Sequence, residues 1–555
     1  MGLIGERTSY YAPMPATRRL AVGLAVVIAV VGVVIGYLAP SPGGPGTLPA
    51  DDTVVSGPLT AAGGPYLTDS HGRVVFLRGV NAVYKRAPYE LYADPGKRWN
   101  FSAADAARMA SLGFNVVRLG IIWQGIEPGT LGPNSSQVCT PGTPRDPHQF
   151  NASVASAYLA RVARTIDVLG KYHIYTLLDM HEDVYSSEFG GEGAPAWAVC
   201  TDGHPVGTLP GRWSNTYNDP ALISSVKHFW TNDVEGDLQG EYIRSWKAVA
   251  SYFSTNPWVV GFDPINEPFT KTLLPGSTEV AARLECLYTG AGRPGRSILD
   301  GSVLSCPPGD PTTGLIETKR AVAPDKLVFF EPDIFSSSGH PNDIGPMNFH
   351  GLVFNFHDYC GLRSGVTGNP TDLDACAEQE LRTMQRRSEE RPDIATVKQP
   401  EGPAWFMSEF GATTSEPLME RLAKIADELQ LGWTYWQWKY YDDPTGSSAE
   451  ALVESDGSLS PAVRALSRVY PQAVAGTPVS FSFDPLTREF HLFYVPATGI
   501  DAPTVIAVPT SLVYPHGYQV AVEGGVVRSA PGADHVAVTN TDGAATVSVT
   551  ITPVG

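Results

Sequence analysis

The stretch Val259-Val260-Gly261-Phe262-Asp263-Pro264-Ile265-Asn266-Glu267-Pro268 begins as an apolar run and ends in polar side chains and a proline. A short apolar run without polar alternation is typical of a strand that is covered on both faces. Strands of this kind belong to parallel sheets, in which a crossover segment, usually a helix, connects one strand to the next. The stretch therefore predicts a chain in which such runs alternate with helices.

The rest of the chain shows this alternation. The candidate strands, in order, are Val74–Asn81, Phe114–Leu119, Tyr172–Asp179, Val259–Asn266, Lys326–Glu331, Leu352–His357, Ala404–Glu409 and Trp433–Trp438. Helical patterns lie between most of them, such as Ala103–Leu112, Ser153–Leu169, Tyr242–Ser254, Ala375–Arg387 and Pro417–Leu429. Eight such units predict a closed (β/α)8 TIM barrel. A doubly wound sheet is the alternative, but no GxGxxG follows the first strand and no GxxxxGKS/T occurs.

A second folded region is expected at the C-terminus. The chain has 555 residues, too many for one ordinary core, and its composition shifts after Val474. Short strands with turns follow: Pro478–Phe483, Glu489–Val495, Pro503–Ala507, Tyr518–Glu523, His535–Thr539 and Ala545–Ile551. We therefore predict an α/β barrel domain over residues 59–472 and a C-terminal antiparallel β-sandwich domain over residues 473–555.

The N-terminus carries a segment of membrane length. Arg18 and Arg19 precede an uncharged apolar run from Leu20 to Ala39, and about 20 helical residues span the hydrocarbon core of a bilayer. The preceding positive charges predict that residues 1–19 form a cytoplasmic tail. We expect residues 20–39 to be a transmembrane signal anchor, with a cleaved signal peptide as the alternative, and residues 40–58 to be a Pro/Gly linker. The protein is then exported, either membrane-anchored with its folded part outside the cytoplasm or secreted.

The cysteines fit an exported protein. Their number is even and they show no zinc spacing: Cys139, Cys200, Cys286, Cys306, Cys360 and Cys376. Outside the cytoplasm we expect disulfides, and neighbourhood in the sequence suggests Cys286–Cys306 and Cys360–Cys376, which leaves Cys139–Cys200. Free buried thiols are the alternative. The net charge of −18 argues against nucleic acid as a partner, and we expect a monomer.

Two glutamates stand at the ends of candidate strands. Glu267 ends the fourth, and Glu409 ends the seventh in Trp405-Phe406-Met407-Ser408-Glu409-Phe410-Gly411. In a TIM barrel the C-terminal ends of the strands meet at one face, where the chemistry takes place. A pair of carboxyl groups there suits glycoside cleavage, in which one donates a proton to the leaving oxygen and the other attacks the sugar carbon.

Other polar and aromatic side chains occur at the same strand ends. We expect the Arg118 guanidinium to hydrogen-bond Glu409 and keep it ionised. The Tyr359 hydroxyl is placed to donate to the same carboxylate and hold its rotamer. Groups that can bind sugar hydroxyls, and one flat apolar ring that can face a pyranose, complete the candidate substrate contacts: Lys85, Asp179, His181, Asp183, Asn266, His357 and Trp436.

Two other kinds of site lack their patterns. His340, His350 and His357 have no metal-ligand spacing and no HExxH occurs, so neither a metal nor another cofactor is expected. A serine hydrolase is not supported because no GxSxG occurs.

Taken together, the motifs resemble glycoside hydrolase family 5, the cellulase family of clan A. They are Leu77-Arg78-Gly79-Val80-Asn81, Gly113-Phe114-Asn115-Val116-Val117-Arg118, Asn266-Glu267-Pro268, His357-Asp358-Tyr359, Ser408-Glu409-Phe410-Gly411 and Trp436. The similarity extends roughly from Gly57 to Tyr470. It implies that Glu267 is the acid/base and Glu409 the nucleophile of a retaining enzyme, with carboxyl groups about 5–5.5 Å apart.

Within this family, several segments of the chain are similar to those of endoglycoceramidases. These enzymes cleave the β-glycosidic bond between the oligosaccharide and the ceramide of glycosphingolipids. The similar segments are Leu178-Asp179-Met180-His181-Glu182-Asp183-Val184-Tyr185, Gly191-Glu192-Gly193-Ala194-Pro195-Ala196-Trp197, Phe330-Glu331-Pro332 and the C-terminal β-domain. The resemblance implies sugar subsites lined by Lys85, Asp179, His181, Asn266, His357, Tyr359 and Trp436.

Two positions depart from the endoglycoceramidase pattern. Glu182 stands where that pattern has Gln, and Ala196 stands where it has a Glu before Trp. Hydrolysis of a simple glucosyl- or galactosylceramide or of a steryl glucoside is therefore an alternative. A second alternative is a β-glucanase or β-mannanase, and a third is a carbohydrate-binding surface protein with an inactive barrel. Transglycosylation in place of hydrolysis also stays open. The aromatic loop between Ser187 and Trp230 is expected either to form an apolar entry for acyl chains or only to pack.

Overall fold

The computed structural model describes residues 54–55, 57–61, 64–92, 96–97, 99–140, 150–207, 213–270, 278–290, 313–342, 344–360 and 372–554. The predicted tail (1–19), membrane segment (20–39) and nearly all of the predicted linker lie outside the described residues. Within the described part of the chain, no helix is both long enough and apolar enough to span a bilayer.

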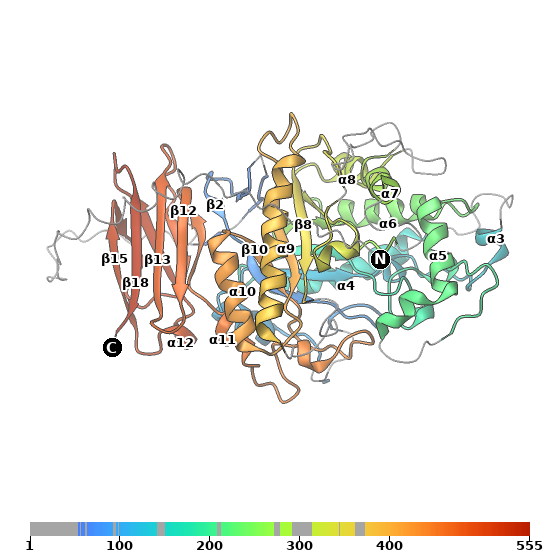
Figure 1. Ribbon diagram of the computed structural model, residues 1–555, viewed down its shortest axis with the longest axis horizontal. Helices are drawn as coiled ribbons and strands as arrows, with labels where there is room; N and C mark the ends of the chain where they lie inside the picture. The colour runs from blue at the N-terminus through green and yellow to red at the C-terminus, as the bar shows by residue number, and fades with distance from the viewer. Residues whose placement is uncertain are drawn as a thin grey trace, which may run out of the picture. The chain divides into compact units, whose positions relative to one another are not determined.

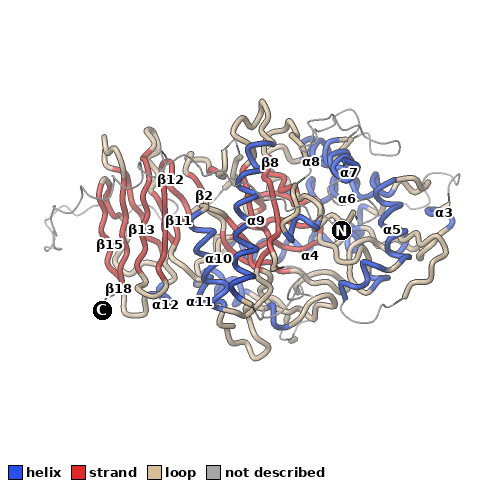
Figure 2. Tube along the Cα trace, in the orientation of Figure 1, coloured by secondary structure: helices blue, strands red, loops and turns tan. Residues whose placement is uncertain are grey.

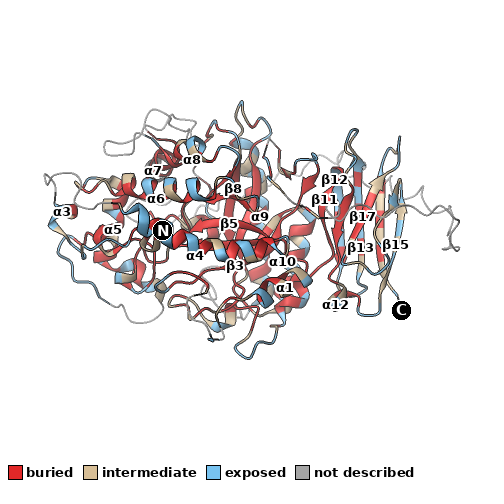
Figure 3. Cartoon of the chain, turned by 180° about the vertical axis from the view of Figure 1, so that it is seen from behind, coloured by how far each residue is buried: buried red, intermediate tan, exposed pale blue. Residues whose placement is uncertain are grey.

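Eight parallel strands close into a barrel, as predicted. They are β3 (Arg78–Ala82), β4 (Val116–Ile121), β5 (Tyr175–Met180), β6 (Val259–Asp263), β7 (Leu327–Phe330), β8 (Leu352–Asp358), β9 (Ala404–Phe410) and β10 (Gly432–Tyr435), and β10 pairs with β3 to close the ring. Every residue of these strands is buried except Gly432, as the red strands of Figure 3 show. Burial on both faces explains why the strands appear in the sequence as apolar runs without alternation.

Helices surround the barrel strands (Figures 1 and 2). The longer ones are α1 (Ala103–Ser111), α4 (Ala152–Gly170), α5 (Pro220–Thr231), α6 (Leu238–Phe253), α7 (Thr278–Thr289), α8 (Leu315–Val322), α9 (Leu373–Asp393) and α10 (Glu416–Glu428). Local chemistry sets where they begin: Asn151 caps α4 by accepting hydrogen bonds from the backbone N–H groups of Ser153 and Val154. Shorter helical turns are α2 (Trp123–Ile126), α3 (Ser136–Cys139), α11 (Ala462–Leu466) and α12 (Thr510–Val513).

The first predicted strand, Val74–Asn81, is wrong as one element. The chain forms β2 (Val74–Val75) in an antiparallel sheet and then β3 in the barrel. β2 pairs with β1 (Leu67–Thr68) and with β11 (Tyr470–Val474), whereas β3 pairs with β4 and β10. Both strands are fully buried and only Phe76 and Leu77 separate them, so the sequence pattern does not show where the chain passes from one sheet to the other.

The C-terminal strands lie in two antiparallel sheets, as predicted, but the first sheet also includes β1 and β2 from the N-terminal side of the barrel. The first has the order β1-β2-β11-β14-β17-β16 and the second the order β12-β13-β18-β15. The remaining bounds are β12 (Gly476–Asp484), β13 (Glu489–Pro496), β14 (Thr504–Ala507), β15 (Tyr518–Glu523), β16 (Gly525–Val527), β17 (His535–Asn540) and β18 (Val547–Pro553). Buried aromatic and branched residues of both sheets, such as Phe490 and Ile506, form one apolar core. The predicted domain boundary at residue 472 falls inside β11.

The first of these sheets covers the end of the barrel where the strands begin. Val75, Ala473 and Val505 of the sheet share an apolar cluster with Val116 and Ala404, the first residues of β4 and β9. We call this sheet the floor of the barrel. The opposite end, where the strands terminate, is therefore the end available to a substrate.

A buried ionic cluster joins the barrel to the sandwich. Asp427 of α10 accepts a hydrogen bond from Arg78 at 2.6 Å and one from Arg468 at 2.7 Å. Arg468 also donates to the carbonyl oxygen of Phe483 in β12 at 2.8 Å. All three charged side chains are at most 2% exposed, so the two guanidinium groups share one buried counter-ion.

Two of the predicted disulfides are present. Cys139 is bonded to Cys200, and Cys360 to Cys376. The third predicted pair, Cys286–Cys306, lies partly outside the described residues because Cys306 is not among them.

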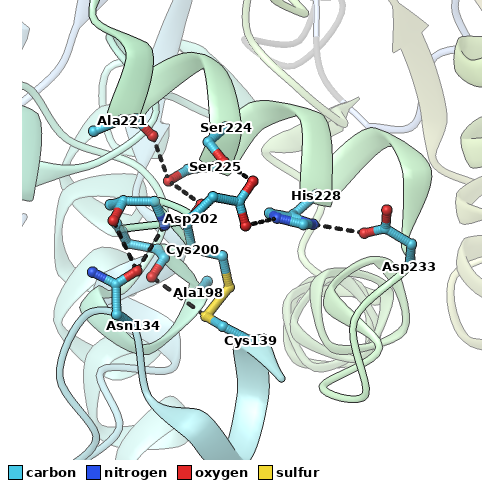
Figure 4. Close-up of a disulfide and its surroundings, with 12 residues drawn as sticks. Asn134, Cys139, Ala198, Cys200, Asp202, Ala221, Ser224, Ser225, His228 and Asp233 are labelled. Atoms are coloured by element: carbon cyan, nitrogen blue, oxygen red, sulfur yellow. Dashed lines mark hydrogen bonds and ion pairs between the residues drawn. A yellow bond between two sulfur atoms is a disulfide. The ribbon is translucent and has the colours of Figure 1, made fainter. Parts of the chain in front are cut away.

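Beside the first disulfide, His228 at the end of α5 lies between two carboxylates (Figure 4). Its Nε2 is 2.8 Å from Asp202 and its Nδ1 is 2.6 Å from Asp233. Asp202 follows Cys200 closely in the sequence, so this contact ties the end of α5 to the segment that carries the disulfide.

Candidate active site

Glu267 lies just beyond β6 in a strained backbone conformation. Its φ is +39°, in the left-handed region that non-glycine residues rarely adopt. Its backbone N–H donates a hydrogen bond to Glu331 Oε2 at 2.9 Å, and its own carboxyl oxygen Oε1 is 2.9 Å from His357 Nδ1 and 3.3 Å from the Ser337 hydroxyl. These contacts on both main chain and side chain hold the carboxyl group in place.

Glu409 is the next-to-last residue of β9, and both of its oxygens are bound. Arg118 Nη1 donates to Oε1 at 2.5 Å, and the Tyr359 hydroxyl donates to Oε2 at 2.8 Å. One oxygen of Glu409, one of Glu267 and a ring nitrogen of His357 all lie within 4.8 Å of one another. The two carboxyl groups predicted to act together therefore do meet in space.

Burial, together with the nearby Glu267 and Glu331 carboxylates, raises the pKa of Glu409 to about 7. His357 and Arg118 oppose this shift because their positive charges favour the carboxylate. The ionised form of Glu409 therefore depends on these two cations.

Arg118 organises the layer beneath these carboxyl groups. It lies in the middle of β4, not at its end as predicted, and its side chain is completely buried. The guanidinium donates to Asn266 at 2.9 Å and pairs with Asp179 at 3.0 Å and with Asp263 at 2.9 Å. It therefore connects the ends of several strands to the position of Glu409.

A pocket opens over the two glutamates. Its empty volume, including the open mouth, is about 390 Å³, and it is lined by His181, Asp183, Trp213, Asn266, Glu267, Tyr359, Glu409, Ala412, Trp436, Thr445, Gly446 and Glu450. Most of the predicted site residues are in this set. Lys85, Arg118, Asp179 and His357 are not, and each contacts residues that do line the pocket.

One wall of the pocket is a stack of rings and charges. The rings of His181 and Trp436 are nearly parallel, with centroids 5.2 Å apart, and the Lys85 ammonium lies 4.6 Å from the Trp436 centroid. Lys85 hydrogen-bonds Asp183, and His181 Nδ1 is 2.7 Å from Asp179. Burial and the positive charge of Lys85 hold the pKa of His181 well below its usual range, so His181 is neutral and offers sugar hydroxyls a hydrogen-bond partner.

Sequence reasoning missed several acidic residues of this site. Glu331, directly after β7, contacts Glu267, Arg118 and His357. Asp443 pairs with Lys85 at 3.2 Å, and Glu450 accepts a hydrogen bond from the Trp436 indole at 2.9 Å. A carboxylate directly after a barrel strand was a usable signal for Glu331, whereas Asp443 and Glu450 come from the loop after β10 and carry no such pattern.

A second, apolar cavity adjoins the pocket at His181. It is lined mainly by aromatic and aliphatic side chains: Trp123, Met180, Glu182, Tyr185, Gly193, Ala194, Val226, Phe229, Trp230, Tyr242, Ile265 and Phe269. The predicted aromatic loop from Ser187 to Trp230 ends in helix α5, which supplies Phe229 and Trp230. Part of that loop thus borders the cavity, and part, such as Trp197 against Trp123, only packs.

Two acidic clusters near the pocket each contact a cationic side chain. His181, Asp183 and Glu192 bring ligand atoms within 4.8 Å of one another, but Lys85 pairs with Asp183 and lies 3.8 Å from Glu192. Glu409, which lies close to Glu267 and His357, binds Arg118. Lys85 and Arg118 each face several carboxylates, so these clusters are suited to hydrogen bonding and proton transfer.

Comparison with known proteins gives consistent matches. Residues 72–290 match the family described as Cellulase (glycosyl hydrolase family 5), and residues 468–552 match the Glycoside hydrolase family 5 C-terminal domain. Endoglycoceramidase I of Rhodococcus hoagii (strain 103S) is 29% identical over 523 residues, covering 89% of this chain and 88% of that protein. The endoglycoceramidase of Hydra vulgaris is 25% identical over 480 residues, covering 82% of this chain and 81% of that protein.

Solved structures agree with these matches. Endo-glycoceramidase II from Rhodococcus sp. in its ganglioside GM3 complex superposes with a TM-score of 0.67 at 26% identity, covering 89% of this chain and 100% of that chain. The lactosyl-enzyme intermediate of the same protein gives a TM-score of 0.65 at 25% identity, with the same coverage.

Proposed function

The chain belongs to glycoside hydrolase family 5, and from this we propose that it cleaves the glycosidic bond between the glycan and the lipid of glycosphingolipids with retention of configuration. The observation that carries the proposal is the pair of carboxyl groups of Glu267 and Glu409 in one pocket. Similarity to endoglycoceramidases over most of the chain supports the choice of substrate.

The spacing of the carboxyl groups supports the retaining route. Oxygens of Glu267 and Glu409 approach within 4.8 Å, whereas inverting enzymes hold their carboxyl groups about 6.5–9.5 Å apart to admit a water molecule. In the first step Glu409 attacks the anomeric carbon, and Glu267 donates its proton to the leaving lipid oxygen as the C–O bond breaks. In the second step Glu267 takes a proton from water, which attacks the same carbon and releases Glu409.

The surrounding residues have roles that fit these steps. Arg118 and Tyr359 donate to Glu409 and hold its rotamer for attack. Asn266 lies beside Glu267 and lines the pocket, where its amide is placed to bind the sugar 2-hydroxyl. Trp436 and His181 line one wall of the pocket, beside the proposed position of the sugar.

The test is incubation of the detergent-solubilised full chain with a glycolipid panel, followed by mass spectrometry of both products. Release of an intact oligosaccharide and ceramide is the expected result. Release of one sugar from a monoglycosylceramide or a steryl glucoside keeps the mechanism and changes the substrate. Cleavage of β-glucan or mannan without cleavage of any lipid would contradict the proposal. The Glu409→Gln variant, prepared in the same way, is the control for contaminating glycosidase activity.

We also propose that the protein acts outside the cytoplasm, tethered by or released from the segment at residues 20–39. The disulfides Cys139–Cys200 and Cys360–Cys376 support this location because cytoplasmic thiols are kept reduced. Fractionation of expressing cells provides the test. Activity in the membrane fraction supports an anchor, activity in the medium supports a cleaved signal peptide, and activity confined to the cytosol contradicts both.

A further inference from the structure

Glu331 is a buried carboxylate that contacts Glu267, Arg118 and His357 without lining the pocket. Its Oε2 accepts the backbone N–H of Glu267 at 2.9 Å, and its Oε1 accepts from Arg118 at 3.1 Å. Oε1 also lies 3.0 Å from His357 Nε2. The side chain is only 3% exposed, so these contacts are made without competition from water.

His357 lies between this carboxylate and the two glutamates of the pocket. Its Nε2 faces Glu331, while its Nδ1 is 2.9 Å from Glu267 and 3.4 Å from Glu409. A neutral imidazole can donate from one ring nitrogen only. Carboxylate oxygens beside both nitrogens therefore favour the doubly protonated ring.

We propose that Glu331 is a positioning residue of the hydrolysis, which keeps His357 as an imidazolium between the two reacting carboxyl groups and fixes the left-handed backbone of Glu267. The inference rests on the proposed roles of Glu267 and Glu409. It adds a residue that touches neither the substrate nor the reacting atoms, and it makes the charge of His357 part of the machinery.

The titration of these groups fits the geometry. Burial opposes a charge on His357, but Glu331 and Glu409 raise its pKa well above the usual range. Burial also opposes a charge on Glu331, yet His357 and Arg118 together lower its pKa to about 2. Titratable and polar groups from all the neighbouring elements face this pair. They are Arg118 (β4), Asp179 (β5), Asp263 (β6), Glu267 (after β6), Tyr288 (α7), Asn355 (β8), Tyr359 (after β8) and Glu409 (β9).

Removing the charge of Glu331 has two opposite effects on Glu409. Loss of the nearby negative charge by itself favours the Glu409 carboxylate and lowers its pKa. Loss of the His357 proton, which follows if Glu331 maintains it, removes a positive charge and raises the pKa of Glu409. Of these influences on Glu409, that of His357 exceeds that of Glu331. We therefore expect Glu331→Gln to move the acid limb of kcat/KM upward by roughly one pH unit.

The first measurement needs no substrate. Full-length protein labelled with ¹⁵N-histidine is followed by NMR across pH, and the His357 signals are assigned by their loss in His357→Gln. In the wild type, both ring nitrogens of His357 should carry protons through neutral pH, and in Glu331→Gln one of them should lose its proton. A neutral His357 in the wild type overturns the proposal even if the variant does not fold.

The second measurement is the pH profile on an activated aryl glycoside. Glu331→Gln should lower kcat by about 10²-fold with little change in KM, because Glu331 does not touch the substrate. The matched control is Glu127→Gln, an equally buried carboxylate that bonds Trp123 and Ser245 and contacts neither catalytic glutamate. The control should leave the acid limb where it is.

The two outcomes separate this inference from the proposed function. An acid limb that moves downward in Glu331→Gln, or stays in place with His357 still protonated, overturns the positioning role and leaves the glycosidase assignment standing. Failure of the wild type on every glycoside contradicts the proposed function, while the NMR result still decides the charge of His357.

Discussion

At the scale of single residues, the most specific prediction concerns the loss of activity when Glu409 is replaced. Glu409→Gln keeps the size of the side chain and its contact with Tyr359, but an amide cannot attack the anomeric carbon. We expect kcat to fall by at least about 10⁴-fold, with an unchanged circular dichroism spectrum. The measurement is turnover of an aryl glycoside and of a glycolipid. Activity within tenfold of the wild type would remove Glu409 from the proposed mechanism.

Glu267 should show a different pattern. Glu267→Ala removes the proton donor, whose contribution depends on how poor the leaving group is. We expect a loss of about 10³-fold or more on a lipid glycoside and a much smaller loss of kcat/KM on a dinitrophenyl glycoside, whose phenolate leaves without protonation. Comparison of the two substrates on the same variant is the check. Equal losses on both would assign Glu267 another role.

At the level of elements, we expect the local stability of the last turn of α5 to depend on pH. Partial burial opposes a charge on His228, but the contacts with Asp233 and Asp202 raise its pKa, and the contacts with Ser224 and His228 lower that of Asp202. A raised folded pKa means that the His228 contribution is complete below its unfolded value, about 6.5, and is lost as pH rises through the folded value. The Asp202 contribution is lost at the acidic end, as pH falls through its lowered pKa.

We therefore expect hydrogen exchange in the last turn of α5 to become faster as pH rises above neutrality, after correction for the intrinsic rate. In the His228→Gln variant, hydrogen exchange of this turn should be fast at every pH, so the pH dependence should disappear. His491→Gln on the exposed face of β13 is the matched control, since His491 also lies beside a carboxylate, Glu489, in the open. A pH dependence that survives in His228→Gln would assign the effect to another group.

The elements also show which parts of the fold could be predicted from the sequence. The barrel strands could be predicted because burial on both faces leaves short, mostly apolar runs without regular polar alternation. The passage from β2 to β3 could not be predicted, because both strands are buried and only two apolar residues separate them. Helix α5 was missed inside the aromatic loop, although Asp219 caps it and Pro220 occupies its first turn, a usual start signal. Within the site, Glu267 and Glu409 could be predicted from their places at strand ends. Glu450 lines the pocket and Asp443 contacts Lys85, but both come from the loop after β10, whose path no local pattern specifies.

For the whole molecule, the Asp427 cluster links the barrel to the sandwich. Asp427→Ala leaves Arg78 and Arg468 buried without their shared counter-ion. Breaking a buried ion pair from one side costs about 3–5 kcal/mol, so we expect a loss of this size in the free energy of unfolding. Chemical denaturation of the purified protein measures it. Glu378→Ala, which removes the exposed partner of Arg382 on α9, is the control and should cost less than about 1 kcal/mol. Equal small losses would show that the cluster is not a structural link.

The floor of the barrel has a consequence for how the protein is made. Strand β2 leaves the ribosome before any barrel strand, and its partner β11 is translated only after the last one. A nascent barrel therefore stays open at the bottom, with its apolar strand starts uncovered, until translation is almost finished. A chain cut short by a premature stop never acquires its floor. Such a product exposes the apolar surface that the sheet covers in the full chain, and exposed apolar surface of this kind favours aggregation and degradation.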